Sequence, residues 1–417
     1  MPDPASTLNK FLVGGAVRDK LLGKPTEDRD WVVIGTTSEA LRTLGFKQVG
    51  KDFPVFLHPV THEEYALARR ERKVAPGYHG FDIDTSSSVS LEEDLARRDL
   101  TINAMAETVD GQLIDPFNGA SDLKARVLRH VSSAFSEDPV RVLRLARFAS
   151  RFADLGFTVA AETGVLVSEM AQAGELNTLA PERVWKELEL ALAENHPATF
   201  FQVLRDNDAL LHILPEIDAL FGVPQPENHH PEGDAGIHTM MALEAAASLT
   251  SDTRVRFATL VHDLGKALTP KSEWPSHRNH ERIGIRQVTQ FCQRLRIPRR
   301  YSELAIVVTG NHLLMHRLPE LRSTTILKLL EALNAFQQPE NIQLFALACQ
   351  ADADGRGLKK KPYPAADLLL KYANAARAVN LEDLAQRFPN GKARSREARR
   401  RRVSAIAEVR SIWRGAQ

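Results

Sequence analysis

Two aspartates one residue apart, Asp28 and Asp30, precede the apolar run WVVIG, which has the composition of a buried strand. Side chains at positions i and i+2 of a strand point to the same face, so both carboxylates would lie side by side if the strand begins near Arg29. Two like charges held that close are unfavourable unless a cation lies between them. The pair therefore indicates either a divalent metal site or, as a lone D-x-D more often does, a solvated turn before an edge strand.

The preceding stretch, LVGGAVRDKLLG, predicts a strand that runs into Gly14 and Gly15 and then a helix. Backbone N–H groups at a helix N-terminus attract anions, and glycines let an anion approach them closely. Arg18, one turn into the helix, can add a charged donor. A Gly-Gly turn is weak evidence alone, but an acid pair on the next strand makes it specific. A phosphate cradle beside acids that hold Mg²⁺ is what phosphoryl or nucleotidyl transfer requires.

The composition of the 417-residue chain, with 43% apolar and 26% charged residues, is ordinary for a globular protein, and its length predicts about two to four domains. A net charge of +1 excludes a general attraction to polyanions, so nucleic acid would have to bind local patches such as the basic run KARSREARRRR. Cys292 and Cys349 fit neither a disulfide framework nor a metal spacing. No apolar run approaches membrane-spanning length, and MPDPASTLNK lacks the regions of a signal peptide, so we expect a cytoplasmic protein.

The pattern of predicted elements changes at about Ser136. Before it, FLVGG, WVVIG, VFLHPV and EEYALAR predict short strands, and AVRDKLLG and SEALRTLG predict helices, the second with Ser38 as its N-cap. After it, RVLRLARFASRFADLG and PERVWKELELALAE predict amphipathic helices. The stretch LFGVPQPENHHPEGDAG, rich in Pro, Gly and Asn, predicts a linker to further helices that hold most of the histidines.

Four strings occur in an order that resembles one known family. They are GGAVRD with DRDWVVIG, RRDLTINA, IDPFNG and EDPVRVLRLARF. Together they resemble the motifs of the CCA-adding enzymes, which are tRNA nucleotidyltransferases of the second class in the polymerase-beta-like superfamily. The match covers the first half of the chain. Bacterial poly(A) polymerases share most of these motifs and are the nearest alternative.

The resemblance implies a role for each matching residue. Asp28 and Asp30 would be the catalytic carboxylates that bind Mg²⁺, and Gly15 and Arg18 would contact the triphosphate. Arg98 would meet the sugar or phosphates of the nucleotide, although an ion pair with an acid on the preceding turn is an alternative that does not exclude binding.

The string EDPVR would read the base. By the resemblance, Asp138 and Arg141 face the incoming base, with Arg144 and Arg147 nearby on the same helix. Residues three apart share one helical face. Cytosine and adenine both present an amino donor beside a ring-nitrogen acceptor, so a carboxylate and a guanidinium together suit both bases.

Two assignments in the first half stay open. A third carboxylate on the neighbouring strand would be Glu63 or Glu64 in EEYALAR, and either can equally be a surface acid. We expect Asp115 and Gly119 of DPFNG to shape a hinge rather than to touch substrate.

The second half carries a separate set of histidines in GIHTMM, LVHDLGK, RNH and TGNHLLMH, followed by ADADGRG. This order resembles the metal-binding HD superfamily of phosphohydrolases. Imidazole and carboxylate donors together suit Mg, Mn, Fe, Ni or Zn and leave positions open for water. The core ligands and two further ligands implied by the resemblance are His238, His262, Asp263, Asp352, His280 and His312.

Three further residues near these ligands in the sequence need an assignment, one as an alternative ligand and two as non-ligands. Asp354 competes with Asp352 for the last ligand position. We expect His277 and His316 to be ordinary core or surface histidines.

These observations predict an α+β protein with four regions. A nucleotidyltransferase head with a mixed or antiparallel sheet would span residues 1–135, followed by an all-α neck over 136–222 that selects the nucleotide and binds tRNA. An HD phosphohydrolase domain would span 223–355, and a basic helical tail 356–417. Poly(A) polymerases of this superfamily generally lack an HD domain, whereas one bacterial group of CCA enzymes carries one in this order.

The implied activity is template-independent addition of C, C and A from CTP and ATP to the 3′ end of tRNA, with release of pyrophosphate. The HD region would hydrolyse phosphomonoesters and 2′,3′-cyclic phosphates with a divalent transition metal such as Ni or Mn, or with Mg. The partners would be tRNA, ATP and CTP, in a monomer or homodimer. The alternatives are a poly(A) polymerase-like enzyme and a non-catalytic protein that binds RNA or nucleotides, although such a module has no need of both metal sets.

Overall fold

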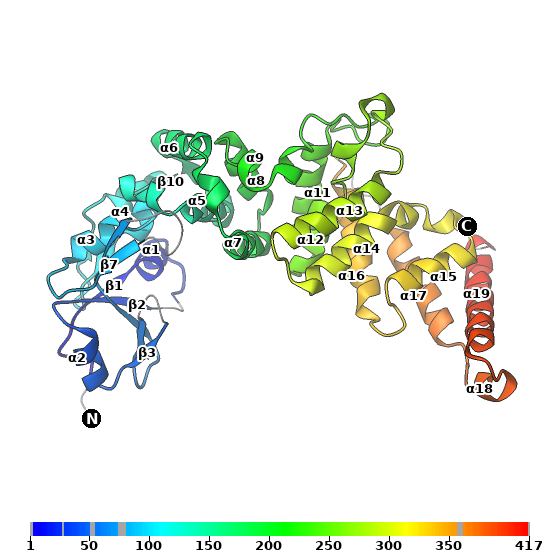
Figure 1. The fold of residues 1–417 in the computed structure, drawn as a ribbon, viewed down its shortest axis with the longest axis horizontal. Coiled ribbons are helices and arrows are strands. Elements are labelled where there is room, and N and C mark those ends of the chain that lie inside the picture. The colour runs from blue at the N-terminus through cyan, green and yellow to red at the C-terminus, as the bar shows by residue number, and fades with distance from the viewer. Residues whose placement is uncertain (1–2, 27–28, 51–54, 74–80, 357–361, 416–417) are drawn as a thin grey trace. The chain divides into compact units, whose positions relative to one another are not determined.

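A seven-stranded mixed sheet lies at the centre of the N-terminal part of the chain (Figure 1). The computed structural model describes residues 3–26, 29–50, 55–73, 81–356 and 362–415. The strands run in the order β3-β4-β5-β2-β1-β8-β9. They are β1 (Asn9–Val13), β2 (Asp30–Ile34), β3 (Lys47–Val49), β4 (Val55–Leu57), β5 (Glu64–Leu67), β8 (Ala106–Glu107) and β9 (Leu113–Ile114). β2 pairs antiparallel with β1 and parallel with β5, and this mixed sheet confirms the predicted α+β class.

Helices and two small strand pairs complete this part of the chain. The strand pairs are β6 (Arg70–Lys73) with β7 (Phe81–Asp84), and β10 (Val127–Leu128) with β11 (Thr158–Val159). The helices are α1 (Gly15–Leu21), α2 (Ser38–Thr43), α3 (Leu91–Ala96), α4 (Gly119–Ala125), α5 (Val140–Arg151), α6 (Ala161–Gln172), α7 (Pro181–Ala193), α8 (Ala198–Asp206) and α9 (Leu210–Ile213).

The central strand β2 is buried on both faces of the sheet. Val32 packs on one face in a cluster that contains Leu95 of α3, and Val33 packs on the other in a cluster that contains Leu41 of α2. Burial on both faces explains why WVVIG is a continuous apolar run rather than an alternating one. The strand is therefore held rigidly, with Asp30 at its first position.

The N-cap of α2 differs from the sequence prediction, and one predicted catalytic residue is not among those described. The hydroxyl of Thr37 accepts a hydrogen bond from the Ala40 N–H and caps α2, so the prediction that Ser38 is the N-cap was wrong by one residue. Asp28 lies outside the described residues.

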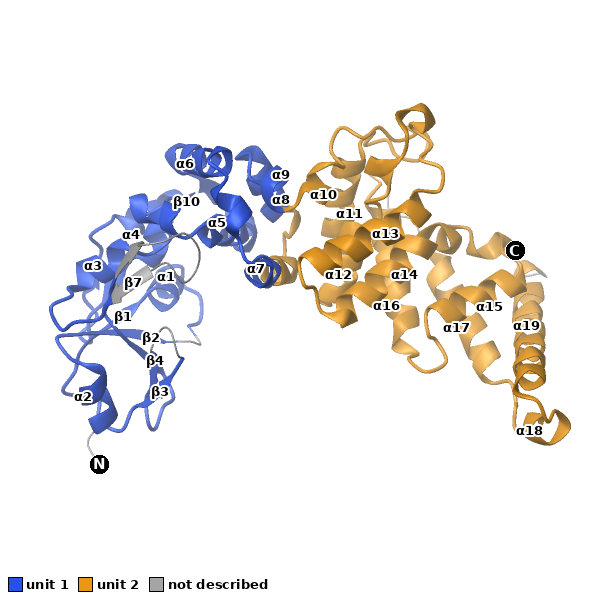
Figure 2. Cartoon of the chain, in the orientation of Figure 1, with its two compact units in different colours: residues 1–187, 199–213 blue, residues 188–198, 214–417 orange. Residues whose placement is uncertain are grey.

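The chain divides into two units, which Figure 2 shows in different colours. The first comprises Met1–Glu187 and Thr199–Ile213, and the second comprises Leu188–Ala198 and Leu214–Gln417. Helices make up the second unit: α10 (Pro215–Asp218), α11 (Ala235–Leu249), α12 (Thr253–Val261), α13 (His280–Arg294), α14 (Arg299–His316), α15 (Ser323–Ala332), α16 (Glu340–Asp354), α17 (Pro364–Arg377), α18 (Leu384–Arg387) and α19 (Gly391–Gly415). Among the described residues, every helix is too short or too polar to cross a membrane.

Candidate active sites

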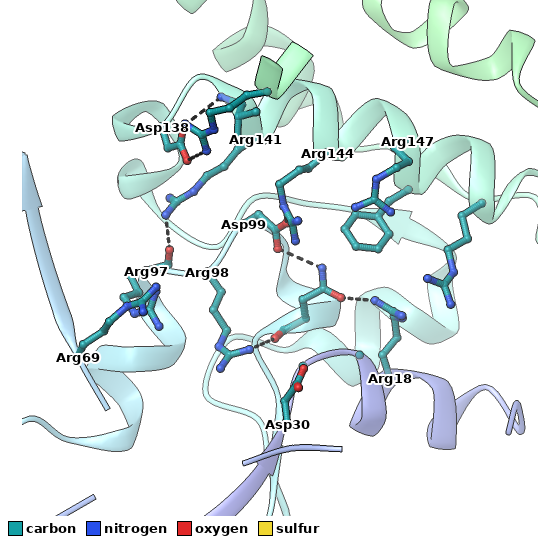
Figure 3. A pocket seen from close by; sticks show the side chains of 17 residues that line it. Arg18, Asp30, Arg69, Arg97, Arg98, Asp99, Asp138, Arg141, Arg144 and Arg147 are labelled. Atoms are coloured by element: carbon teal, nitrogen blue, oxygen red, sulfur yellow. Dashed lines mark hydrogen bonds and ion pairs between the residues drawn. The ribbon is translucent and has the colours of Figure 1, made fainter. Parts of the chain in front are cut away.

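One cavity of about 580 Å³ in the first unit is lined by every described residue that the sequence assigns to nucleotide transfer (Figure 3). These residues are Gly15, Arg18, Asp30, Arg98, Asp138, Arg141, Arg144 and Arg147. Arginines that the sequence did not single out line it as well, among them Arg69, Arg97, Arg151 and Arg183. So many guanidinium groups around one cavity favour a polyanionic ligand such as a triphosphate.

The sheet register places a second acid beside Asp30. Asp30 pairs with Val13 of β1 on one side and with Glu64 of β5 on the other. Residues in register on adjacent strands point to the same face, so Glu64 is directed to the face of the sheet that carries Asp30. Glu63 faces away and accepts a hydrogen bond from Trp31 Nε1 at 3.1 Å. Carboxylate oxygens in this arrangement suit Mg²⁺, and Glu64 rather than Glu63 is the geometric candidate for a third ligand.

The Gly-Gly turn brings two arginines to the cavity. Gly14 has φ +68°, which glycine adopts without strain, and a Cβ there would lie 2.9 Å from Arg98 Nη1. Arg18 is buried, with only 3% of its surface exposed. Its Nη1 donates to Asn103 Oδ1 at 2.5 Å, and its other nitrogens donate to Asp19 at 2.9 and 3.0 Å. This network fixes the guanidinium at the cavity wall.

The alternative for Arg98, an ion pair with the preceding helix, is present in the structure. Arg98 Nη2 donates to Asp94 Oδ2 at 3.1 Å, while the same residue lines the cavity. Asp94 is fully buried and also accepts from Arg97 at 2.7 Å. The carboxylate therefore holds two arginines at the mouth of the same cavity.

A buried acid supports the next arginine on α5. Arg144 Nε donates to Asp99 Oδ2 at 2.7 Å (Figure 3). Burial by itself would raise the pKa of Asp99, but the Arg144 charge and hydrogen bonds from Asn103 and the Leu100 N–H lower it from 3.8 to about 2. Asp99 therefore stays ionised and anchors Arg144.

The two residues expected to read the base are held by protein groups. Asp138 accepts two hydrogen bonds from Arg183 of α7, at 2.9 and 2.7 Å, and one from the Val140 N–H at 3.2 Å. Arg141 donates to the carbonyl oxygens of Ala134 and Arg97 at 2.5 and 2.6 Å. Asp138 is extended and precedes α5, so the expectation that it shares a helical face with Arg141 was wrong. The prediction did not include Arg183, because a contact between residues 45 positions apart has no local sequence pattern.

Asp115 acts at a helix terminus. Its carboxylate accepts from the N–H groups of Gly119 and Ala120 at 2.7 and 2.9 Å, at the start of α4. Neither Asp115 nor Gly119 lines the cavity, so their predicted role in chain geometry rather than in substrate contact remains our interpretation.

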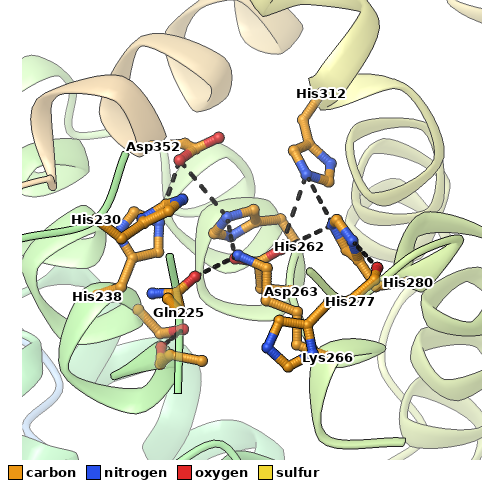
Figure 4. Close-up of polar contacts among 12 residues, drawn as sticks. Gln225, His230, His238, His262, Asp263, Lys266, His277, His280, His312 and Asp352 are labelled. Carbon is orange, nitrogen blue, oxygen red and sulfur yellow. Dashed lines mark hydrogen bonds and ion pairs between the residues drawn. The ribbon is translucent and has the colours of Figure 1, made fainter. Parts of the chain in front are cut away.

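A second set of polar side chains lies inside the second unit, where helices α11, α12, α13, α14 and α16 converge (Figure 4). It brings together all six predicted ligands: His238, His262, Asp263, His280, His312 and Asp352. Their donor atoms form overlapping groups of three in which the atoms lie within 4.8 Å of one another. Each of these residues is at least nine-tenths buried.

The chemistry of this cluster fits a divalent metal. Nε2 of His262 and Oδ1 of Asp263 are buried and make no hydrogen bond within the described residues, the state expected of ligand atoms. Burial lowers the pKa of His312 to about 3, which keeps its imidazole in the neutral form that binds metals. Although burial would raise the pKa of Asp263, the neighbouring His262 and Lys266 hold it well below its usual range. The set therefore offers the neutral imidazole of His312 and the ionised carboxylate of Asp263. Burial would lower the pKa of His238, but its contacts with Asp352 and Glu232 raise it.

Residues outside the predicted ligand set orient it. Glu232 Oε1 lies 2.8 Å from His238 Nδ1, and Lys266 Nζ lies 2.6 Å from Asp263 Oδ2. A carboxylate on the far nitrogen of a ligand histidine fixes the ring tautomer and strengthens the ligand. Glu232 lies in the stretch predicted to be a linker, so that prediction was incomplete: the stretch also forms a wall of the cluster.

The two histidines that we expected not to be ligands differ in their surroundings. His277 is buried and bonds to Thr269 Oγ1 at 2.7 Å and to the Pro224 carbonyl, as expected of a core histidine. His316 lies against the cluster, with its Nε2 2.6 Å from Asp352 Oδ2, so the expectation that it is an ordinary histidine stays a prediction. Its one-turn spacing from His312 on α14 was a signal that could have found it.

Comparisons with known proteins match three successive stretches of the chain to family models and the chain as a whole to one family. Residues 10–129 match the family "Poly A polymerase head domain", residues 156–221 match "Probable RNA and SrmB- binding site of polymerase A", and residues 235–373 match "HD domain". The multifunctional CCA protein of Thioalkalivibrio sulfidiphilus is 55% identical over 98% of this chain and 100% of its own. That of Methylococcus capsulatus is 54% identical over 97% and 96%. The chain belongs to the multifunctional CCA protein family.

Membership of this family confirms the resemblance that the motif order indicated. Solved structures agree in fold. The CCA-adding enzyme of Bacillus stearothermophilus in complex with CTP matches with a TM-score of 0.63 and 21% identity, over 98% of this chain and 89% of the other. A CCA-adding enzyme in apo form II matches with a TM-score of 0.64 and 20% identity, over 96% and 90%.

Proposed function

We propose that this multifunctional CCA enzyme adds C, C and A to the 3′ end of tRNA from CTP and ATP, without a nucleic-acid template, and hydrolyses phosphate esters at its HD site. The observation that carries the first activity is the single cavity in which Asp30, the Gly14–Gly15 turn and the segment Asp138–Arg141, which leads into α5, meet. Family membership supports the whole proposal. As a tRNA enzyme it works in the cytoplasm, as a monomer or homodimer.

Transfer proceeds by in-line attack of the terminal 3′-hydroxyl on the α-phosphorus, with pyrophosphate as the leaving group. Asp28 and Asp30 hold Mg²⁺, with Glu64 as a further acid on the neighbouring strand. The metal supplies charge neutralisation at the reacting phosphate. The triphosphate is held in position for this attack by Gly15, Arg18 and the other arginines that line the cavity.

The nucleotide is selected by protein because no template is present. The Asp138 carboxylate accepts from the exocyclic amino group of cytosine or adenine, and Arg141 donates to the adjacent ring nitrogen. Uracil and guanine present a carbonyl and a ring N–H instead, which leaves polar partners unmatched. Arg144 and Arg147 bind the nucleotide from the same helix.

The HD site is a separate hydrolase that removes phosphate from phosphomonoesters and opens 2′,3′-cyclic phosphates. Its metal would be held by the six predicted ligands, His238, His262, Asp263, His280, His312 and Asp352. Ni²⁺ or Mn²⁺ suits these mixed nitrogen and oxygen donors better than Mg²⁺ does. The metal supplies a nucleophilic water at neutral pH.

One experiment tests the transfer activity and its alternatives. The protein is incubated with a tRNA that lacks its CCA end, together with CTP, ATP and Mg²⁺, and the products are sequenced. We expect addition to stop after three residues in the order C, C, A. A long A tract would support the poly(A) polymerase alternative, and no addition would support a binding protein.

A further inference from the structure

A cavity of about 740 Å³ in the second unit adjoins the histidine–aspartate cluster. Lys266, His280 and His316 line its inner end, next to the predicted ligands. Its other lining residues include Leu313 and Leu314, so one part of the wall is apolar. The volume lies within the range of small-molecule sites.

The charged residues that line this cavity favour an anion. Lys266, Arg278, Arg317 and Arg356 are cationic, and Glu281 is the one carboxylate among the described lining residues. Two of these cations, Lys266 and Arg317, are committed to other groups, and Arg278 is exposed. Lys266 Nζ, which is buried, is committed to Gln225 Oε1 at 2.5 Å and to Asp263 Oδ2 at 2.6 Å. The Arg317 side chain is 70% exposed and pairs with Glu320 at 2.9 Å.

Arg356 is more buried than the two other arginines, and its donors are less committed than those of Lys266. It follows the C-terminus of α16, and its side chain is only 23% exposed. Among the residues that the structure describes, its hydrogen-bond partner is Asp352, whose Oδ1 lies 3.3 Å from Nη2, while the buried Nε has none. A guanidinium has five N–H donors, so within the described part of the chain most of its donor capacity is unused. An acceptor for the Nη donors can come from the adjoining cavity.

We propose that Arg356 is the phosphate anchor of the HD site, which takes a phosphoryl group borne on a ribose or nucleoside. Its Nη1 and Nη2 N–H groups bind two non-bridging oxygens of the substrate, a pairing that the planar guanidinium favours over a lysine ammonium. The contact of Nη2 with Asp352 directs the guanidinium toward the predicted metal ligands, so a phosphate held there would lie beside them. The apolar wall at Leu313 and Leu314 accommodates the organic part. The inference rests on the proposed hydrolase activity and assigns its substrate recognition.

The test measures binding of inorganic phosphate, AMP and 2′,3′-cyclic AMP to the full-length protein by calorimetry, without metal and with Mn²⁺. The variants are Arg356→Gln and Arg356→Lys, with Arg317→Gln as a control that removes the same charge from the cavity rim. We expect Arg356→Gln to weaken all three ligands about ten- to hundredfold, the usual value of a charged hydrogen-bond pair. Arg356→Lys should restore part of the loss, and Arg317→Gln should bind as the wild type does. Mn²⁺ affinity, measured separately, should be nearly unchanged in all variants.

Any one of three outcomes would overturn the assignment of Arg356 as the phosphate anchor. The first is that the wild type binds no phosphate, and the second is that Arg317→Gln loses as much phosphate affinity as Arg356→Gln. The third is that Arg356→Gln loses Mn²⁺ affinity while its metal-free phosphate binding persists. The third result would make Arg356 a positioning residue for Asp352. A wild-type protein that binds phosphate through Arg356 but hydrolyses no phosphate ester with any divalent metal would refute the hydrolase activity and leave the anchor standing. Unequal losses for AMP and the cyclic nucleotide would identify which ester the anchor favours.

Discussion

At the scale of single residues, the register of β2 with β5 predicts which carboxylates are needed for nucleotide transfer, and substitutions can test it. Asp30→Asn removes a ligand charge from the metal and should lower CMP incorporation by about 10²-fold or more, with little change in the midpoint of thermal unfolding. Glu64→Gln should also lower the rate, whereas Glu63→Gln, which alters an acid hydrogen-bonded to Trp31, should not. Rates are measured with a tRNA that lacks its CCA end. Equal effects of the two glutamate variants would show that the strand register does not decide the third ligand.

Asp99 links the cavity to the stability of the first unit. Its pKa is about 2 in the folded state against 3.8 in the unfolded chain, because Arg144 and two hydrogen bonds outweigh the effect of burial. A depressed folded pKa stabilises the fold above about pH 4, and this contribution is lost as the pH falls toward 2. The difference corresponds to about 2 kcal/mol at neutral pH.

We therefore expect Asp99→Asn to lower the free energy of unfolding at pH 7 and to flatten its dependence on pH between about 4 and 2. The stability of this unit is measured separately by urea unfolding, monitored through hydrogen exchange in peptides from β1 to α5. The control Glu92→Gln removes an exposed charge from α3 and should follow the wild-type curve. A wild-type slope in Asp99→Asn would show that other groups cause the acid sensitivity.

At the scale of secondary-structure elements, the contact of α7 with the extended residue that precedes α5 bears on base selection. Arg183 occupies one hydrogen-bonding position on each oxygen of Asp138 and so fixes the direction of the carboxylate's remaining lone pairs. If this carboxylate reads the amino group of the base, Asp138→Ala should lower discrimination against UTP and GTP. Arg183→Gln should lower it less, because the carboxylate remains but is no longer fixed. Single-turnover incorporation of each nucleotide measures both effects.

The control for this pair is Lys186→Gln, which removes a positive charge from the exposed face of α7 one turn away. It should leave both rate and discrimination unchanged. If Asp138→Ala and Arg141→Ala kept full discrimination, base reading would lie elsewhere and the start of α5 would have only a structural role.

Local sequence pattern was sufficient to predict individual elements and the residues that each contributes. The strands β2, β4 and β5 and the helical second half follow from apolar periodicity and turn residues. Contacts between elements did not follow, because they depend on packing rather than on spacing. Arg183 on Asp138 and Glu232 on His238 are examples, and Glu232 was hidden in a stretch whose proline and glycine content indicated a linker.

At the scale of the whole molecule, the described residues of each candidate site lie within one compact unit. The cavity that carries Asp30 lies in the first unit, and the histidine–aspartate cluster lies in the second. The two sites also differ in donor chemistry, since carboxylates alone suit Mg²⁺ and imidazoles with carboxylates suit transition metals. Neither set of ligands has a member in the other unit, so the two activities should respond to different substitutions and to different metals.

We expect His262→Ala to abolish hydrolysis of phosphate esters and to leave CCA addition within about twofold of the wild type, because the substitution removes a ligand only from the second unit. Asp30→Asn should have the reverse effect. Both activities are measured on the same preparations, with Mg²⁺ for addition and with Ni²⁺ or Mn²⁺ for hydrolysis, and thermal unfolding shows whether each variant folds. Because His262 is only 1% exposed, its loss can loosen the second unit. His280→Gln, at the start of a different helix, therefore serves as an independent ligand variant. Parallel loss of both activities in two well-folded ligand variants would mean that the sites are coupled and that neither unit acts alone.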